Sequence, residues 1–132
     1  GAAFYRLNVN GPVIGMMARG HVYSNPAWLT VERMAAKRIV TEAPGARHAS
    51  FRFVAGELDP FPTRDTWLDT ASRIPGEITL LYGEGTPRKS RAEMAALAGL
   101  KNVGATVLPQ GKLSFHEEYP DETAGAILKA LA

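Results

Sequence analysis

Two stretches of the sequence carry side chains that could act together as acid and base. In LLYGEGTPRKS, residues 80–90, an apolar run ends in a loop that carries Glu84. In GKLSFHEEYP, residues 111–120, His116 lies in a loop before an apolar helical pattern. An imidazole titrates near neutral pH and can take a proton from a nucleophile, while a carboxylate can orient that imidazole. Glu84 and His116 are therefore candidates for an acid and a base, and their chemistry alone does not assign them to one site.

Each member of this pair has an ordinary structural explanation as well. Glu84 can be a solvated loop residue. His116 can pack beside Phe115 and pair with one of the two glutamates that follow it. Asp59, in FVAGELDPF, is a second candidate for the acid, but an Asp before a proline is also a common turn former.

The nucleophile that such a pair would serve is missing from the sequence. There is no cysteine, and no serine stands in the G-x-S-x-G pattern that places a nucleophile on a sharp strand-to-helix turn. An aspartate in G-x-D-x-G is absent too. Because triad chemistry needs three groups and the chain supplies at most two, we expect no triad hydrolysis from this chain alone. The five serines are Ser24, Ser50, Ser72, Ser90 and Ser114.

Other kinds of site find little support. Three separated histidines without H-x-H or H-E-x-x-H spacing do not predict a metal site, and we expect no cofactor. The Gly-Glu-Gly stretch at 83–85 is too short for a phosphate-binding loop. Four side chains of the N-terminal region could line an apolar pocket for an acyl group, although ordinary helix packing explains them as well: Met16, Met17, Tyr23 and Trp28.

Composition limits the classes of protein that remain. The 132 residues, 45% hydrophobic and 21% charged, amount to one domain that is long enough to bury an ordinary core. A net charge of +2 is too small to predict a nucleic-acid partner. No apolar run reaches the roughly 18 residues of a membrane span, and the lack of cysteine is compatible with a reducing cytoplasm, where we expect the protein. Gly1 in place of an initiator Met leads us to expect that upstream coding sequence is missing.

The first 75 residues predict a series of helices. Thr30 and Thr63 are good N-cap residues. The stretch at 46–56 alternates like a strand but also follows a helical stripe that ends at Gly56, and we favour a helix. Pro75 and Gly76 mark the end of this segment. The helices are expected at about 12–24, 31–43, 46–55 and 64–72.

Residues 76–132 alternate strand and helix, with strands expected at 78–82 and 104–108 and helices at about 90–100 and 120–131. Ser90 and Glu93 are expected to form a capping box for the first of these helices. This order predicts parallel strands with helices on both faces, in a narrow sheet whose two edges are unpaired. The last helix carries an apolar stripe that we expect to face inward: Ala124, Ile127, Leu128 and Leu131.

The order of the elements and two stretches of sequence resemble the C-terminal part of α/β-hydrolase-fold proteins. EITLLYGEGTPRKSRAEMAAL, residues 77–97, resembles the acid-bearing strand and loop of that family. VGATVLPQGKLSFHEEYPDETAGAIL, residues 103–128, resembles its histidine-bearing strand, loop and helix. The resemblance implies a partial α/β-hydrolase fold, in which residues 1–75 are a helical cap-like segment and residues 76–132 are a short parallel β-α-β-α part of the core. It also implies that the nucleophile and the oxyanion hole lie upstream.

The family pattern is not met at its two catalytic positions. It places the acid at Thr86 and the histidine within Gly111-Lys112, so neither expected side chain is present. Glu84 and His116 are the nearest substitutes, and each is displaced from the family position.

Two classes of function follow, and both stay open. In the first, the chain is the C-terminal part of a hydrolase of ester or similar bonds that acts on a small apolar or ester substrate, with His116 as base and a displaced acid. In the second, it is a non-catalytic relative that binds a ligand or a partner. A third possibility is that the 132 residues are themselves a small interaction module, a homodimer or larger homo-oligomer in which exposed sheet edges of two copies pair.

Overall fold

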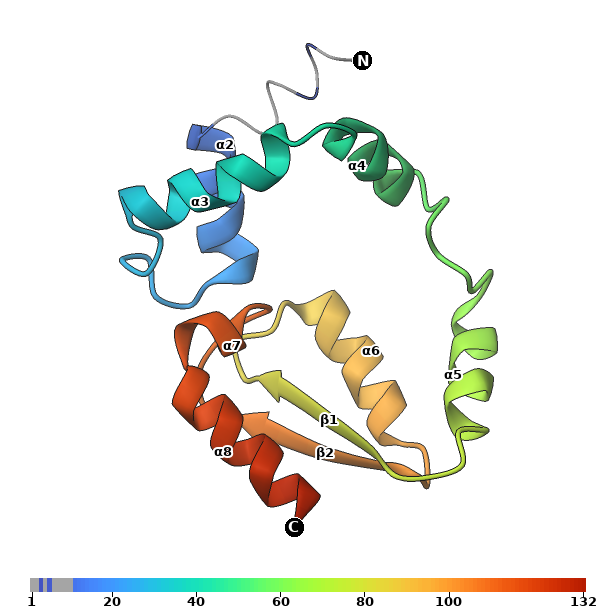
Figure 1. The fold of residues 1–132 in the computed structure, drawn as a ribbon. Coiled ribbons are helices and arrows are strands. Elements are labelled where there is room, and N and C mark those ends of the chain that lie inside the picture. Colours follow the sequence, from blue (N-terminus) through green and yellow to red (C-terminus); the bar gives the residue numbers. More distant parts are fainter. Residues whose placement is uncertain (1–2, 4, 6–10) are drawn as a thin grey trace.

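The structure is a computed structural model that describes residues 3, 5 and 11–132; Gly1 lies outside the described residues. An N-terminal run of helices is followed by a unit of strands and helices (Figure 1). The first run contains α2 (Gly11–Met17), the π-helical η1 (Ala18–Val22), α3 (Val31–Glu42), α4 (Ala46–Val54) and α5 (Arg64–Ser72). The second contains β1 (Ile78–Gly83), α6 (Arg88–Ala98), β2 (Val103–Leu108), α7 (Phe115–Glu118) and α8 (Pro120–Leu131). Every expected helix and strand is present, including the helix favoured at 46–56.

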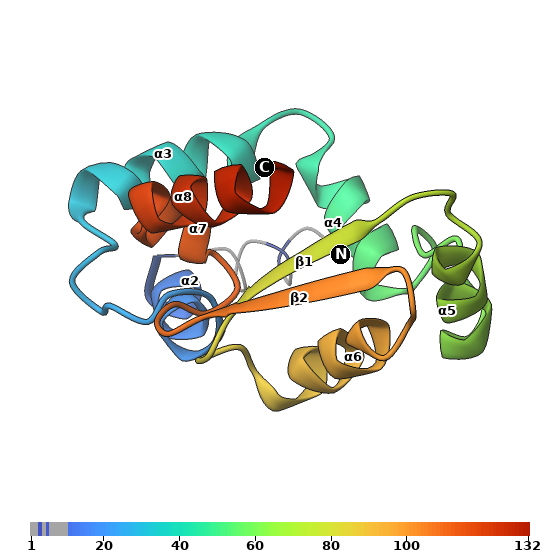
Figure 2. The same ribbon diagram turned by 90° about the horizontal axis from the view of Figure 1, so that it is seen from below.

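The two strands lie side by side and run in parallel, as the order of elements predicts. Ile78 is opposite Val103 and Gly83 is opposite Leu108, so the whole of each strand is paired. In Figure 2, α6 lies on one face of the sheet and α8 on the other. The fold is therefore a mixed α/β arrangement, and among the described residues the outer edge of each strand has no neighbouring strand.

Short-range sequence signals begin three of the helices where expected. The Thr30 hydroxyl accepts a hydrogen bond from the Arg33 N–H at 3.3 Å, and the Thr63 hydroxyl accepts one from the Thr66 N–H at 3.2 Å. Each bond satisfies one of the backbone donors that a helix leaves free at its N-terminus. Pro120 begins α8, where its fixed φ suits the first turn.

The predicted capping box at α6 is wrong. The helix begins at Arg88 and its cap position is Pro87, whose extended backbone ends the preceding loop without a side-chain hydrogen bond. Ser90 therefore lies inside the helix. The Glu93 carboxylate instead forms an ion pair of 2.9 Å with Arg64, which joins α6 to α5.

The apolar stripe of α8 is not buried as predicted. Ile127, Leu128 and Leu131 are 44%, 68% and 79% exposed. A sheet of two strands offers little surface for a helix to pack against, so most of the apolar stripe stays accessible. Only Thr123, in the first half of α8, belongs to the buried residues of this helix.

The hydrophobic core is small. The buried apolar residues in the described part of the chain are Ala18, Tyr23, Ala71 and Leu108, and no large side chain there is fully enclosed. The length of the chain would permit a larger core than these residues form. Because a fully buried apolar side chain contributes about 1.5–3 kcal/mol, so short a list supplies limited stability. Polar contacts between segments therefore contribute a larger share of the stability of the fold.

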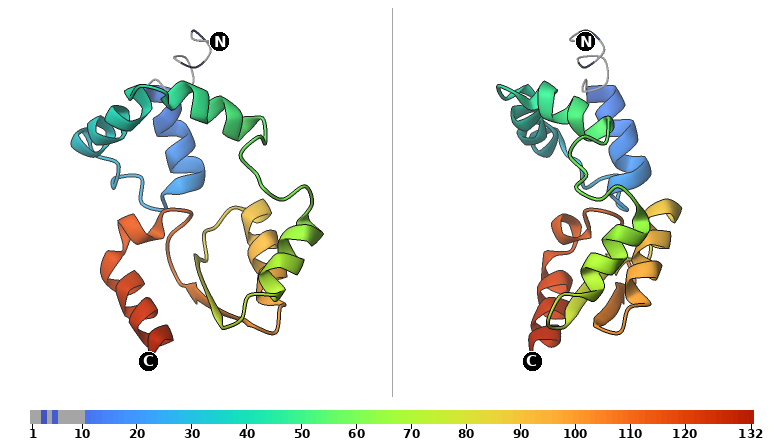
Figure 3. Two further views of the ribbon diagram at one scale, coloured as in Figure 1. Left: turned by 45° about the vertical axis from the view of Figure 1, so that its right-hand side comes forward. Right: turned by 90° about the vertical axis from the view of Figure 1, so that its right-hand side faces the viewer.

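The helices α2, η1 and α3 lie next to the loops at the carboxyl ends of the strands, whereas α5 lies beside α6 (Figures 1 and 3). The Ser114 N–H donates to the Val22 carbonyl at 3.1 Å, where the loop before α7 passes the end of η1. The Lys112 ammonium donates to the Arg19 and Gly20 carbonyls at 2.9 and 3.1 Å. The loop after β2 is thus held against η1, within the N-terminal segment formed by α2, η1 and α3.

Candidate functional site

An open pocket of about 490 Å³ lies at the carboxyl ends of β1 and β2. Residues 84–85 after β1 and 109–111 after β2 form part of its lining, and Ser24, Asn25 and Tyr119 complete it. The carboxyl ends of parallel strands are where open α/β sheets bind ligands. The pocket is therefore the candidate functional site of the chain.

The two strand-end loops are held in close contact. A Cβ added to Gly83 would lie 2.3 Å from the Gly111 carbonyl oxygen, so this approach requires a glycine. The Glu84 N–H donates to the Leu108 carbonyl at 2.9 Å, and the Gly85 N–H donates to the Gly111 carbonyl at 3.0 Å. The floor of the pocket is thus fixed by backbone contacts between the two loops.

The position that the family resemblance assigns to the acid has a structural role. Thr86 is 2% exposed, and its carbonyl accepts a hydrogen bond from the Arg91 guanidinium at 3.1 Å. The same guanidinium donates to the Glu84 carbonyl. The exposed Glu84 side chain lines the pocket, and no described residue forms a hydrogen bond or an ion pair with its carboxylate.

His116 is exposed on the short helix α7, and its ring meets the Phe115 ring edge-on, with centroids 5.9 Å apart. The packing beside Phe115 that the sequence allowed is therefore observed, whereas in the described part of the chain no hydrogen bond or ion pair joins His116 to Glu117 or Glu118. Within the described residues, no hydrogen bond or ion pair joins His116 to Glu84. The structure does not bring the two candidates together, and their catalytic pairing stays a prediction.

Asp59 occupies a different part of the molecule. It lies in the loop between α4 and α5, where its Oδ1 accepts a hydrogen bond from the Phe61 N–H at 2.9 Å. The predicted turn-forming role is confirmed. Asp59 is not among the residues that line the strand-end pocket.

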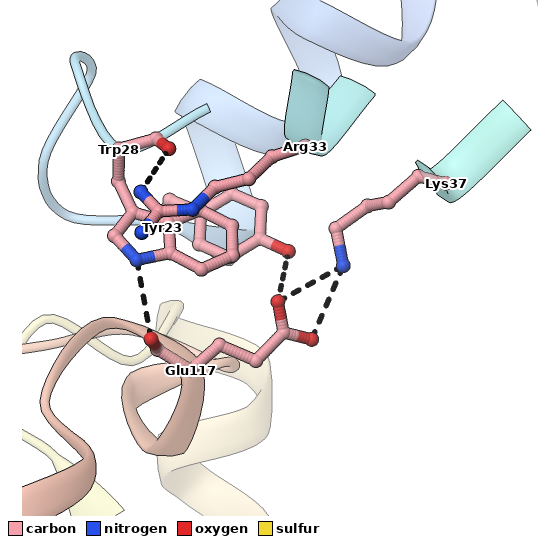
Figure 4. Close-up of polar contacts among 5 residues, drawn as sticks. All are labelled: Tyr23, Trp28, Arg33, Lys37 and Glu117. Carbon is pink, nitrogen blue, oxygen red and sulfur yellow. Dashed lines mark hydrogen bonds and ion pairs between the residues drawn. The ribbon is translucent and has the colours of Figure 1, made fainter. Parts of the chain in front are cut away.

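A polar cluster joins α7 to the N-terminal segment (Figure 4). The Glu117 carboxylate accepts hydrogen bonds from the Tyr23 hydroxyl at 2.8 Å and from the Lys37 ammonium at 2.9 and 3.2 Å. The Glu117 carbonyl accepts one from the Trp28 indole N–H at 3.1 Å. Tyr23 stacks on Trp28 with ring centroids 4.4 Å apart, and the Arg33 guanidinium lies 4.2 Å from the centre of the Trp28 ring. We call these five residues the Trp28 cluster.

The pKa values of three residues reflect these contacts. Burial alone would raise the pKa of Glu117, but the hydrogen bonds from Lys37 and Tyr23 and the Lys37 charge outweigh it, so that pKa is lowered. Burial would lower the pKa of Lys37, and its contacts with Tyr23 and Glu117 raise it instead. Burial raises the pKa of Tyr23. At neutral pH the cluster therefore holds a charged Lys37–Glu117 pair and a neutral phenol.

The next residue, Glu118, forms hydrogen bonds with residues that line one side of the strand-end pocket. Its carboxylate accepts hydrogen bonds from the Ser24 and Asn25 N–H groups at 2.9 and 2.7 Å, and the Ser24 hydroxyl lies 3.1 and 3.2 Å from its two oxygens. The same hydroxyl is 3.0 Å from the Tyr119 hydroxyl. Glu118 thus fixes the part of the pocket that comes from the N-terminal segment.

Reasoning from the sequence missed the roles of Glu117 and Glu118, which it considered only as partners for a histidine. Their hydrogen-bond partners lie 80 to 94 residues away along the chain, so no local pattern points to them. The four N-terminal side chains that could line an acyl pocket lie in two different environments. Tyr23 and Trp28 pack in the Trp28 cluster, whereas Met16 and Met17 are 65% and 54% exposed.

Three further findings bear on function. In residues 3, 5 and 11–132, no group of three His, Cys, Asp or Glu side chains could hold a metal ion. None of the helices in that part of the chain has the length and apolar character needed to cross a membrane. Comparison with known protein families, curated proteins and solved structures finds no match to this chain.

Proposed function

We propose that the protein binds a small polar ligand in the strand-end pocket, as a non-catalytic relative of the α/β hydrolases. One observation carries the proposal: the two strand-end loops and the Ser24-Asn25 turn are fixed around this pocket, but the acid and base candidates are not joined there. The side chains at the two family positions support it. Thr86 is buried, and Lys112 is engaged by backbone carbonyls.

The lining of the pocket favours a ligand with hydrogen-bond donors and disfavours an anion. Glu84 contributes a carboxylate with no partner in the described part of the chain, which can accept hydrogen bonds from a hydroxyl or an amide. Asn25, Gln110 and Tyr119 add uncharged donors and acceptors. No Lys, Arg or His is among the described lining residues, so an anionic ligand would lack a counter-charge. A polar ligand therefore fits this site better than the small apolar substrate expected from the sequence.

A titration with ethyl lactate, which carries both a hydroxyl and an ester, tests this proposal. Followed by NMR, it should shift the amide signals of residues 84–85 and 110–111. Glu84→Gln should weaken binding about threefold to tenfold, because the neutral amide oxygen is a weaker acceptor than the carboxylate. Glu77→Gln, an exposed glutamate before the opposite end of β1, is the matched control and should leave binding unchanged. Shifts spread over the whole chain, or equal effects of the two variants, would rule the site out.

A second candidate function is ester hydrolysis by a longer polypeptide that contains this chain. It is favoured by the Glu84 carboxylate after β1, which has no partner among the described residues, and by the exposed His116 in the segment after β2. Both are close in sequence to the positions where the resembling family carries its acid and its histidine. An upstream nucleophile and a rearranged α7 loop would then complete the site.

Turnover of p-nitrophenyl acetate by that longer polypeptide tests the second candidate. His116→Ala should lower kcat/KM by about 10²- to 10⁴-fold, the usual effect of removing a general base. His48→Ala, which removes an exposed histidine on α4, is the control and should leave the rate unchanged. The 132-residue chain alone should show no turnover that depends on His116. Equal rates for the two histidine variants would eliminate this function.

A further inference from the structure

A second pocket, of about 470 Å³, lies between the loop before α5, the start of α5, and α6. Its apolar lining includes the rings of Phe61 and Trp67 and the thioether of Met94, and each of these side chains is half-buried. The pocket shares no lining residue with the strand-end pocket. It is therefore a separate place where a ligand could bind.

The charged side chains around this pocket have a net negative charge. The Arg64 guanidinium is engaged by α6, through an ion pair of 2.9 Å with Glu93 and a hydrogen bond of 3.0 Å to the Ala92 carbonyl. The remaining charged lining residue is Asp59, which is exposed. One Asp59 oxygen accepts the Phe61 N–H, and no described residue forms an ion pair with this carboxylate.

The wall that carries Asp59 and Phe61 is stiffened by local structure. The Asp59 side chain closes a turn onto the Phe61 N–H, and prolines at positions 60 and 62 fix two φ angles. Thr63 then caps α5, where its hydroxyl lies 2.8 Å from the Thr66 hydroxyl. A wall that is ordered before binding lowers the entropy cost of holding a ligand.

The two aromatic rings lack the partners that such rings usually find inside a protein. Among the described residues, no cation lies over Trp67 or Phe61, and no acceptor binds the Trp67 indole N–H. Trp28 is different, because Arg33 lies over its ring and the Glu117 carbonyl binds its N–H. Aromatic faces carry negative charge density and attract cations, most strongly when the cation has an apolar shell that can contact the ring.

We propose that this second pocket binds a small alkylated ammonium ion. The Asp59 carboxylate balances its charge, and its alkyl groups pack against Trp67, Phe61 and Met94. A metal ion suits the site less well, because metals need several convergent oxygen or nitrogen ligands and no group of three metal-binding side chains occurs in the described part of the chain. This inference does not depend on the function proposed for the strand-end pocket.

Choline and its neutral isostere 3,3-dimethylbutan-1-ol provide the test. The two have nearly the same shape, but only choline is charged. Titration of the 132-residue chain, followed by the NMR signal of the Trp67 indole N–H, should show choline binding about tenfold more tightly. Equal affinities, or no shift of this signal with up to tens of millimolar choline, would overturn the proposal.

Two variants locate the binding site. Asp59→Asn keeps an oxygen that can close the turn onto Phe61 but removes the charge, so choline should lose most of its advantage over the isostere. Asp65→Asn, which removes an exposed charge on α5 outside the lining of the pocket, should leave that advantage intact. The proposal fails if Asp65→Asn acts like Asp59→Asn. Both are surface changes, so the chain should fold in each case.

Discussion

Trp28 and Trp67 are both half-buried, but their indoles differ in the contacts that they make with the rest of the chain. The Trp28 ring is stacked on Tyr23, lies under Arg33 and donates its N–H to the Glu117 carbonyl. Trp67 makes none of these contacts with the described residues, although it lines a pocket with Phe61 and an acidic side chain. The chain thus supplies its own cation and acceptor at one tryptophan and leaves the other accessible to a ligand.

This difference separates a structural role from a binding role. The contacts of Trp28 join the N-terminal segment to α7, and they matter because few apolar residues are buried anywhere in the described part of the chain. The contacts of Trp67 lie within one part of the chain, between α5 and α6. We therefore expect changes at Trp28 to act mainly on stability and changes at Trp67 mainly on binding.

The largest expected effect comes from truncating the two indoles. Trp28→Leu should lower the free energy of unfolding by about 2–3 kcal/mol, because it loses a ring stack, a cation contact and a hydrogen bond together. Trp67→Leu should cost about 1 kcal/mol, since it loses only part of its apolar contact. Urea denaturation followed by circular dichroism measures both. Equal losses would mean that the two sites do not differ in the way proposed.

A smaller effect is expected for the ion pair between Lys37 and Glu117. The side chains are 35% and 29% exposed, so solvent screens their attraction, and a double-mutant cycle with Lys37→Met and Glu117→Gln should give a coupling of about 0.5–1 kcal/mol. The pair Arg52–Glu57, with side chains 59% and 60% exposed, is the matched control and should couple by about 0.3 kcal/mol or less. A coupling at Lys37–Glu117 no larger than that of the control would show that the cluster holds the segments together by packing alone.

The pH dependence of stability should be smaller still. The lowered pKa of Glu117 means that its contribution is present above the ordinary glutamate pKa of about 4.3 and is lost as the pH falls through the folded-state pKa. The raised pKa values of Lys37 and Tyr23 act on the other side: their contribution is present below the ordinary values of about 10 and is lost as the pH rises.

Urea unfolding between pH 3.5 and pH 9 checks the acid limb of this profile. Stability should fall below about pH 5, and Glu117→Gln should make that fall shallower. Glu77→Gln removes an exposed glutamate outside the cluster. In this variant the free energy of unfolding should fall with pH as steeply as in the wild type. An unchanged slope in Glu117→Gln would assign the acid limb to other carboxylates.

How much of this structure the sequence predicts depends on how far apart the interacting residues are. Caps at Thr30 and Thr63 act within three residues, and both were predicted correctly. The parallel pairing of β1 and β2 followed from the alternation of strand and helix. The capping box at Ser90 failed because the loop ends earlier, at Pro87, which the pattern of hydroxyl and acid residues does not reveal.

The candidate sites were predicted less well than the elements. Glu84 was singled out from its place after an apolar strand, and the structure puts it in the strand-end pocket. The role of Glu117 depends on residues from a distant helix and loop, and the second pocket depends on the packing of α5 against α6. Such convergence is a property of the folded chain, and no spacing within one segment encodes it.

The weakest effect is expected at the sheet, where the backbone groups along the outer edge of each strand have no partner among the described residues. Unpaired strand edges favour association with a further strand, and we expect two copies of this chain to pair weakly through them, as monomers at micromolar and dimers near millimolar concentration. Sedimentation equilibrium at both concentrations measures this. Val107 on β2 is 48% exposed, and Val107→Lys should abolish the dimer, because a buried lysine beside the new strand would be unpaired. Ile127→Lys changes a residue of similar exposure, 44%, on α8 and should leave the dimer intact, whereas loss of the dimer in this variant would assign the contact to the helix face.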